Sequence, residues 1–65
     1  MDEWILALSL IKRDEGTDAV FDGSAYLRLN PEGVPTLNVY YKLRVGEPKK
    51  HVMYKYLDNF WTKVN

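Results

Sequence analysis

The sequence predicts a small, mainly β domain: an antiparallel sheet or partly open barrel of about four strands, with a short C-terminal helical turn. The chain has 65 residues, which is enough for one domain, taken as residues 1–65. Turn-forming residues recur at intervals of roughly 8–12 residues, as in small all-β folds. The segments between them are rich in aromatic and β-branched residues, which favour strands.

The first expected strand is segment 4–12. Its even positions from Trp4 to Leu10 are large and apolar, which suits a strand with both faces at least partly covered. A helix is the competing interpretation, because acids precede the segment, bases follow it and Gly16 could cap its end. We favour the strand.

Segment 19–29 is strand-like but interrupted at Asp22-Gly23, where a bulge or a turn is expected. Its second part alternates, with Tyr26 and Arg28 on the face opposite the apolar side chains. Residues 30–33, Asn-Pro-Glu-Gly, then predict a hairpin turn, because Pro presets φ and Gly accepts a positive φ.

Segment 36–45 is the clearest strand in the chain, because five apolar positions recur there with a period of two, which does not fit a helix. The apolar set is Leu37, Val39, Tyr41, Leu43 and Val45. The alternating set is Asn38, Tyr40, Lys42 and Arg44, and it is expected to face outward.

Segment 50–57 is expected to pair back on 36–45 as a strand, with Val52, Tyr54 and Tyr56 turned inward. Asp58 would then cap the short final helical turn. The alternative is a full C-terminal helix over 50–64, which would make the fold α+β, because apolar residues in this region also fit helical spacing.

The composition argues against catalysis and against a bound cofactor. There is no cysteine, and His51 is the only histidine, so disulfides are excluded and a structural zinc site is nearly so. The acids Asp14, Asp18 and Asp22 recur every four residues, but this spacing matches a calcium-binding loop poorly. We therefore expect a binding protein that is not an enzyme and has no metal site.

The N-terminus is acidic and the run from Trp4 to Ile11 is too short to cross a bilayer. We therefore expect a cytoplasmic protein with no membrane association; it could equally be a phage or viral product inside a host cell. A domain this small is marginally stable, so a homodimer is a second route to stability beside a dense core.

The formal net charge is zero, but the charges are unevenly distributed. Residues 1–24 carry six acids and two bases, and residues 25–65 carry three acids and seven bases. Such asymmetry between the halves can indicate a basic binding face.

Alternation along the expected strands predicts one outward face that carries aromatic rings and cations and no acid. Rings on such a face would stack bases and cations would contact phosphates, as in proteins that bind single-stranded DNA or RNA. The stacking residues would be Tyr26 and Tyr40, the phosphate contacts Arg28, Lys42, Arg44 and Lys55, and Lys49 and Lys50 would extend the track through a mobile loop; Asn38 and His51 share the face. The alternative is a small adaptor or inhibitor that docks on a protein partner, since Tyr and Arg are also enriched at protein interfaces.

Overall fold

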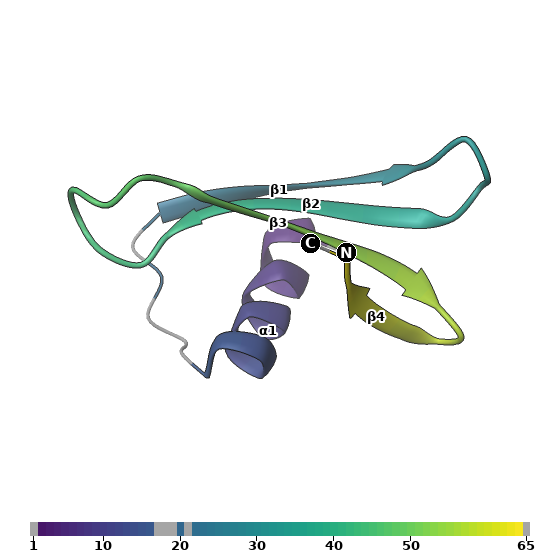
Figure 1. The fold of residues 1–65 in the computed structure, drawn as a ribbon, viewed down its shortest axis with the longest axis horizontal. Helices are drawn as coiled ribbons and strands as arrows, with labels where there is room; N and C mark the ends of the chain where they lie inside the picture. Colours follow the sequence, from purple (N-terminus) through teal and green to yellow (C-terminus); the bar gives the residue numbers. More distant parts are fainter. Residues whose placement is uncertain (1, 17–19, 21, 65) are drawn as a thin grey trace.

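The computed structural model describes residues 2–16, 20 and 22–64 and contains one helix and four strands. The strands form a single antiparallel sheet in the order β1-β2-β3-β4, and the helix lies on one side of it (Figure 1). The elements are α1 (Glu3–Glu15), β1 (Asp22–Leu29), β2 (Pro35–Lys42), β3 (Lys50–Leu57) and β4 (Phe60–Lys63). The prediction of a small, mainly β fold of four antiparallel strands is confirmed, and the sheet is open.

The strand expected at 4–12 is wrong, because this segment forms most of α1. The carboxylate of Asp2 caps the helix by accepting a hydrogen bond from the Trp4 amide at 2.9 Å. Gly16 ends the helix in the left-handed region at φ 72°, and its amide donates to the Lys12 carbonyl at 3.0 Å. The residues at the two ends of the segment, which favour the competing interpretation of a helix, therefore indicate the secondary structure correctly.

Strand β1 begins at Asp22 and pairs with β2 along its whole length, so the expected interruption at Asp22-Gly23 is wrong. Residues 19 and 21 of the expected segment lie outside the described residues. The turn over 30–33 is confirmed: Gly33 has φ 80° and donates to the Asn30 carbonyl at 2.8 Å. The Asn30 side chain also accepts two backbone hydrogen bonds, from residues 32 and 34, at 2.9 Å each.

The C-terminus forms a tight hairpin of β3 and β4, so both the short helical turn and the alternative helix over 50–64 are wrong. Asp58 and Asn59 form a two-residue turn, with φ values of 53° and 62°. Positive φ at both central positions matches the twist of antiparallel strands, and Asp and Asn tolerate it better than other side chains. The chain therefore turns back at once, and β4 pairs with β3.

Strand β2 ends at Lys42, three residues before the end of the expected segment. Leu43 still packs against the core, but Val45 is 76% exposed and does not belong to it. The prediction that Val45 faces inward is therefore wrong. The strand expected over 50–57 is confirmed as β3.

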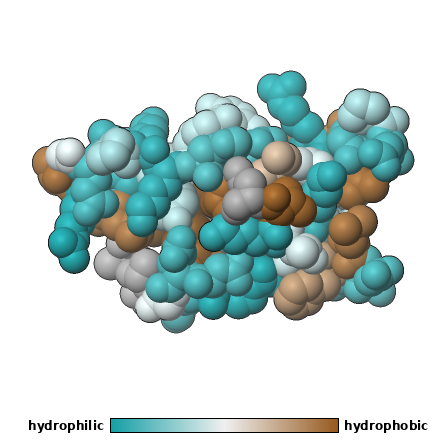
Figure 2. Space-filling view, viewed as in Figure 1, coloured by the Kyte–Doolittle hydropathy of each residue, from teal (hydrophilic) through white to brown (hydrophobic). Residues whose placement is uncertain are grey.

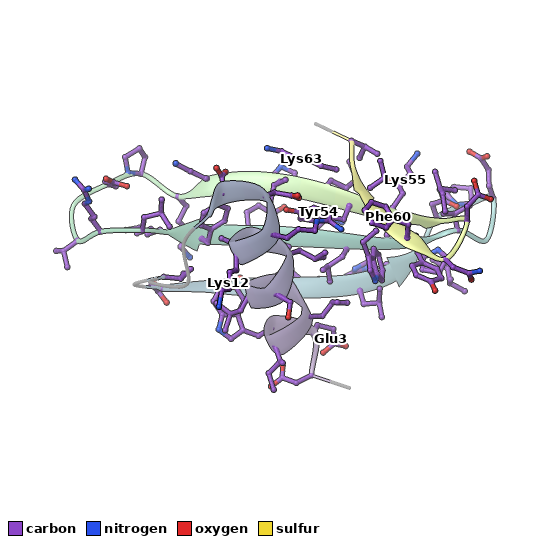
Figure 3. The ribbon with its side chains drawn as sticks, turned by 90° about the horizontal axis from the view of Figure 1, so that it is seen from below. Glu3, Lys12, Tyr54, Lys55, Phe60 and Lys63 are labelled. Carbon is purple, nitrogen blue, oxygen red and sulfur yellow. The ribbon has the colours of Figure 1, made fainter. Side chains whose placement is uncertain are left out.

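The core lies between α1 and the middle of the sheet. Figure 3 shows that the helix crosses the strands on this side of the sheet. Among the described residues, the buried apolar side chains are Ala7, Leu10 and Ile11 from the helix, Leu37, Val39 and Tyr41 from β2, and Val52 and Tyr54 from β3. Of the described helices, none is long and apolar enough to cross a membrane.

Two core tyrosines connect the sheet to the last turn of the helix. The hydroxyl of Tyr41 donates to Glu15 Oε1 at 2.9 Å. Burial and this hydrogen bond raise the pKa of Tyr41 to about 12. Burial, with a smaller contribution from a hydrogen bond to Asp14, raises the pKa of Tyr54 as well. Both rings therefore fill the space below the sheet while their hydroxyl groups meet helix carboxylates.

These raised pKa values predict a loss of stability at alkaline pH. The folded protein holds the Tyr41 proton more tightly than the unfolded chain does. The stabilisation that Tyr41 gives the folded state is therefore complete below pH 10, the ordinary pKa of tyrosine, and disappears as the pH rises toward 12. We expect the urea midpoint to fall over this range. Tyr41→Phe should flatten the decrease, whereas Tyr26→Phe, at an exposed position of the other face, should not. A decrease of equal slope in all three proteins would contradict this expectation.

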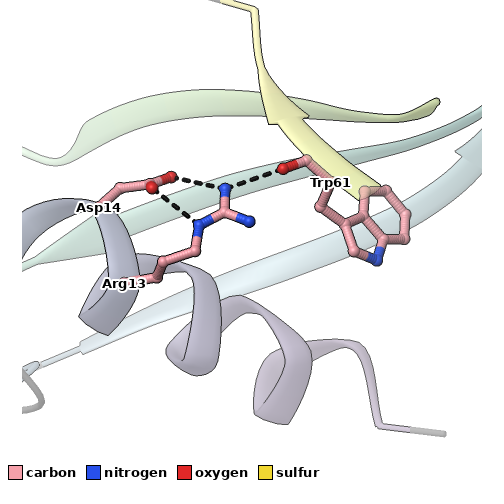
Figure 4. A network of polar contacts seen from close by, with 3 residues as sticks. All are labelled: Arg13, Asp14 and Trp61. Atoms are coloured by element: carbon pink, nitrogen blue, oxygen red, sulfur yellow. Dashed lines mark hydrogen bonds and ion pairs between the residues drawn. The ribbon is translucent and has the colours of Figure 1, made fainter. Parts of the chain in front are cut away.

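Arg13 connects the helix to the edge strand β4. Its guanidinium bonds the neighbouring Asp14 carboxylate at 2.9 and 3.1 Å and donates to the Trp61 carbonyl at 2.8 Å (Figure 4). The same group lies 4.7 Å from the centre of the Phe60 ring. The hydrogen bond from Arg13 lowers the pKa of Asp14.

Gly23 allows the first turn of the helix to approach β1. A Cβ atom at this position would lie 2.5 Å from the Tyr40 carbonyl oxygen and closer still to the Trp4 ring. The indole can therefore pack on the strand only where the side chain is absent.

Gly23→Ala is accordingly expected to lower the free energy of unfolding by about 1–3 kcal/mol, the usual cost of overpacking. Urea denaturation followed by tryptophan fluorescence measures it. Ser24→Ala, at the next position of the same strand, should stay within about 0.5 kcal/mol of the parent protein. A Gly23→Ala variant as stable as the parent would contradict the packing described.

Candidate nucleic-acid interface

The surface of interest is the face of the sheet that points away from α1, here called the open face. Because side chains alternate along each strand, the residues that neighbour the core positions belong to it. On the first three strands the open face comprises Asp22, Ser24, Tyr26 and Arg28 from β1, Thr36, Asn38, Tyr40 and Lys42 from β2, and His51, Met53 and Lys55 from β3.

The register places these side chains in rows across the sheet. Tyr40 is opposite His51 of β3, and Tyr26 is opposite Asn38. Thr36 lies between Arg28 and Lys55, its partners on the two neighbouring strands. The predicted site residues Tyr26, Arg28, Tyr40, Lys42 and Lys55 therefore share one surface.

Three rings form an aromatic group at the centre of the open face. The rings of Tyr40 and His51 stack, with centroids 4.5 Å apart and planes 9° from parallel. Tyr26 meets Tyr40 edge to face, at 6.4 Å and 67°. Tyr26 is 51% exposed and Tyr40 36%, so both retain ring surface for a ligand.

Asn38 lies beside this aromatic group and is hydrogen-bonded to it. His51 Nε2 is 3.1 Å from Asn38 Oδ1. Since an amide oxygen only accepts hydrogen bonds, this contact requires the tautomer of His51 that carries a proton on Nε2. The histidine is thus fixed both by a stacking contact and by a hydrogen bond.

A shallow depression of about 290 Å³ opens between the rings, and its lining residues are Tyr26, Arg28, Asn38 and Tyr40. It is lined by two aromatic rings, a guanidinium group and an amide. Its volume is at the lower end of the range for small-molecule sites, which suits one planar group.

Cations flank the aromatic group at both ends. Arg28 and Lys55 occupy the row of Thr36 at one end. Lys42 is at the other end, six residues from Thr36 along β2, which is about 20 Å at the usual rise per residue. The expectation that this face carries no acid is wrong, because Asp22 is the register partner of Lys42. The acid is at the margin of the face, and the aromatic centre contains none.

Three predicted site residues do not join the open face. Arg44 follows the end of β2, and Lys49 lies in the loop before β3. Lys50 pairs with Tyr41, so by alternation it belongs to the helix side of the sheet. A track running through these three residues would therefore leave the aromatic surface.

Asn38 and His51 are expected on this face from the sequence, but sequence reasoning assigns them no binding role. Their importance comes from the stacking contact and the hydrogen bond between neighbouring strands. The register alone brings together positions 13 residues apart, and nothing local in the sequence indicates it.

Two side chains that could carry chemistry, His51 and Asp14, each have a polar partner in the structure. His51 is hydrogen-bonded to the Asn38 amide and stacked on Tyr40. Among the acids that recur every four residues, Asp14 is bonded to Arg13, and Asp18 lies outside the described residues. No group of three or more metal-ligating side chains occurs in the described part of the chain.

Comparisons of the chain with protein-family models, with curated proteins and with solved structures found no significant match.

Proposed function

We propose that the protein is a non-catalytic module that binds single-stranded nucleic acid on the open face. The observation that carries the proposal is the aromatic group of Tyr26, Tyr40 and His51 with cations at both ends. Rings accept any base by stacking, at about 1–3 kcal/mol per base, and cations follow the phosphates.

Each part of the open face has a separate role in this proposal. Tyr26 and the outer side of His51 offer ring surface at the two margins of the group, and Tyr40 borders the depression. Arg28 and Lys55 would contact phosphates at one end and Lys42 at the other. A single strand would thus lie across the rings, with its backbone held on both sides.

The proposal predicts binding that weakens with salt. Each phosphate contact to a single strand contributes roughly 0.7 to the slope of log affinity against log salt, so three cations give a slope of about −2. Fluorescence anisotropy with a labelled 12-nucleotide DNA and RNA, at several salt concentrations, measures both affinity and slope. Absence of binding at low salt would refute the proposal.

A second candidate function is docking on a protein partner, and the helix side of the molecule favours it. Leu29 is 71% exposed, Ile5 62% and Phe60 56%. Figure 2 shows apolar surface at the end of the molecule that holds the β1–β2 and β3–β4 turns. Exposed apolar side chains of this size are typical of interaction sites when they gather.

Pull-down from nuclease-treated lysate separates the two functions. A partner retained by the parent protein and by Lys42→Glu, but absent with Leu29→Asp, would favour protein docking through the helix side. Disappearance of all retained material after nuclease would favour nucleic acid.

A homodimer and a cytoplasmic location are further parts of the proposal. Light scattering over a range of protein concentrations tests the first, because mass action makes a dimer concentration-dependent. Cell fractionation tests the second.

A further inference from the structure

We infer that the depression between Tyr26 and Tyr40 selects bases with a keto group (uracil, thymine and guanine) over those with an amino group in its place. This inference rests on the proposed function, because it concerns the same surface. It assigns a specificity to a site for which stacking alone would predict none.

The first element of this specificity is the orientation of the Asn38 amide. Its oxygen accepts from His51 Nε2 at 3.1 Å, so the NH₂ group points away from the histidine. No partner for that NH₂ group occurs among the residues the structure describes. Since Asn38 lines the depression, the amide offers a base two N–H donors.

The second element is the chemistry of the other lining groups. The guanidinium of Arg28 donates hydrogen bonds and accepts none. The lining side chains therefore combine a guanidinium and an amide NH₂ with two phenol hydroxyls, which can donate or accept. The guanidinium and the amide NH₂ group of the depression can only donate.

The third element is the pattern on the bases. Thymine and uracil carry an O4 acceptor, and guanine carries O6 and N7 acceptors. Cytosine carries an N4 amino donor at the position where uracil has O4, and adenine carries an N6 amino donor beside its N7 acceptor. The donors of the site pair with the keto group, whereas an amino group at the same position faces other donors and makes no hydrogen bond to them.

The stacking geometry supports insertion of one base at this point. One face of the Tyr40 ring is covered by His51, in near-parallel contact at 4.5 Å. The same ring lines the depression, with Tyr26 at 6.4 Å. A base in the depression would therefore rest against Tyr40 with its polar edge near Asn38 and Arg28.

His51 acts here as a positioning residue. It fixes the Tyr40 ring by stacking and determines which atom of the Asn38 amide remains free. If the hydrogen bond is removed and the stacking ring is kept, the amide can rotate and present its oxygen instead. Affinity should then persist while discrimination between bases falls.

The test compares two oligonucleotides of equal length, oligo(dU) and oligo(dC), by anisotropy at low salt. They differ at position 4 of the ring, a keto group in one and an amino group in the other, and at N3, which carries a proton in uracil and is an acceptor in cytosine. We expect the parent protein to bind oligo(dU) about tenfold more tightly, as one well-paired base edge would give. Equal affinity, or tighter binding of oligo(dC), would overturn the inference and leave the proposed function standing.

Failure to bind either oligonucleotide would refute the proposed function itself, so the two failures are distinguishable. Variants then locate the preference. His51→Phe retains a ring beside Tyr40 and should reduce the dU/dC ratio toward one. Asn38→Asp replaces the donor by an acceptor and should lower or invert the ratio.

Lys55→Ala serves as the control, because it removes a phosphate contact outside the depression. It should weaken both oligonucleotides equally and leave the ratio unchanged. A ratio that remains tenfold in Asn38→Asp and His51→Phe would show that these residues do not set the preference.

Discussion

Replacing Arg28 and Lys55 together by glutamate is expected to weaken oligonucleotide binding on the order of a hundredfold at low salt. The two cations flank Thr36 in one row of the open face. Reversing these two charges removes two phosphate contacts and makes both positions repel the phosphate backbone of the oligonucleotide. The slope of log affinity against log salt should also become shallower, by about 0.7 for each cation that no longer meets a phosphate.

The matched control is the double reversal Lys50→Glu with Lys63→Glu. It changes the net charge by the same amount, but both residues pair with core tyrosines and so belong to the helix side. We expect this control to weaken binding far less. Equal weakening in the two double variants would mean that overall charge, and not the open face, governs binding.

Leu37→Ala is expected to lower the free energy of unfolding by about 2–5 kcal/mol. The Leu37 side chain is 0% exposed and lies in the core between the helix and the sheet. For a domain of this length, a typical total is roughly 3–10 kcal/mol, so one such cavity removes a large part of it. Urea denaturation measures the change.

Leu29→Ala is the control of the same chemical type, because Leu29 is 71% exposed. Its free energy of unfolding should stay within about 0.5 kcal/mol of the parent protein. If both variants were destabilised equally, the core would not lie where the structure places it.

Alternation predicts the central part of the sheet because β2 and β3 have one covered face each. A strand covered on one side must repeat with a period of two, and Leu37, Val39 and Tyr41 do so. The same period places Tyr26, Arg28, Tyr40, Lys42 and Lys55 on one surface from the sequence alone. It gives no information about where β2 ends, because Val45 continues the pattern beyond the strand.

The N-terminal segment is misassigned from sequence because its apolar residues are too dense to show one period. The buried positions Ala7, Leu10 and Ile11 follow helical spacing, but neighbouring apolar residues also fill the even positions. The decisive information is local: the Asp2 cap and the left-handed Gly16. In this segment the signals at the helix ends therefore carry more information than the apolar run between them.

Two other wrong predictions, the C-terminal helical turn and the interruption at Asp22-Gly23, depend on backbone conformation. Asp58-Asn59 is a weaker hairpin signal than Asn-Gly, and an Asp at this point also fits a helix start. Gly23 resembles a break in the strand, whereas its lack of a side chain admits Trp4. An interruption at this point would also remove Asp22 from the open face, which is why an acid there is not expected from the sequence.

The most direct test of the proposed interface is a titration of ¹⁵N-labelled protein with a short oligo(dU), followed by backbone amide shifts. We expect the largest changes at Tyr26, Arg28, Asn38, Tyr40 and His51, with α1 little affected. Changes concentrated at Leu29 and Phe60, or no changes at protein concentrations far above those used for the anisotropy measurements, would show that the open face does not bind a single strand.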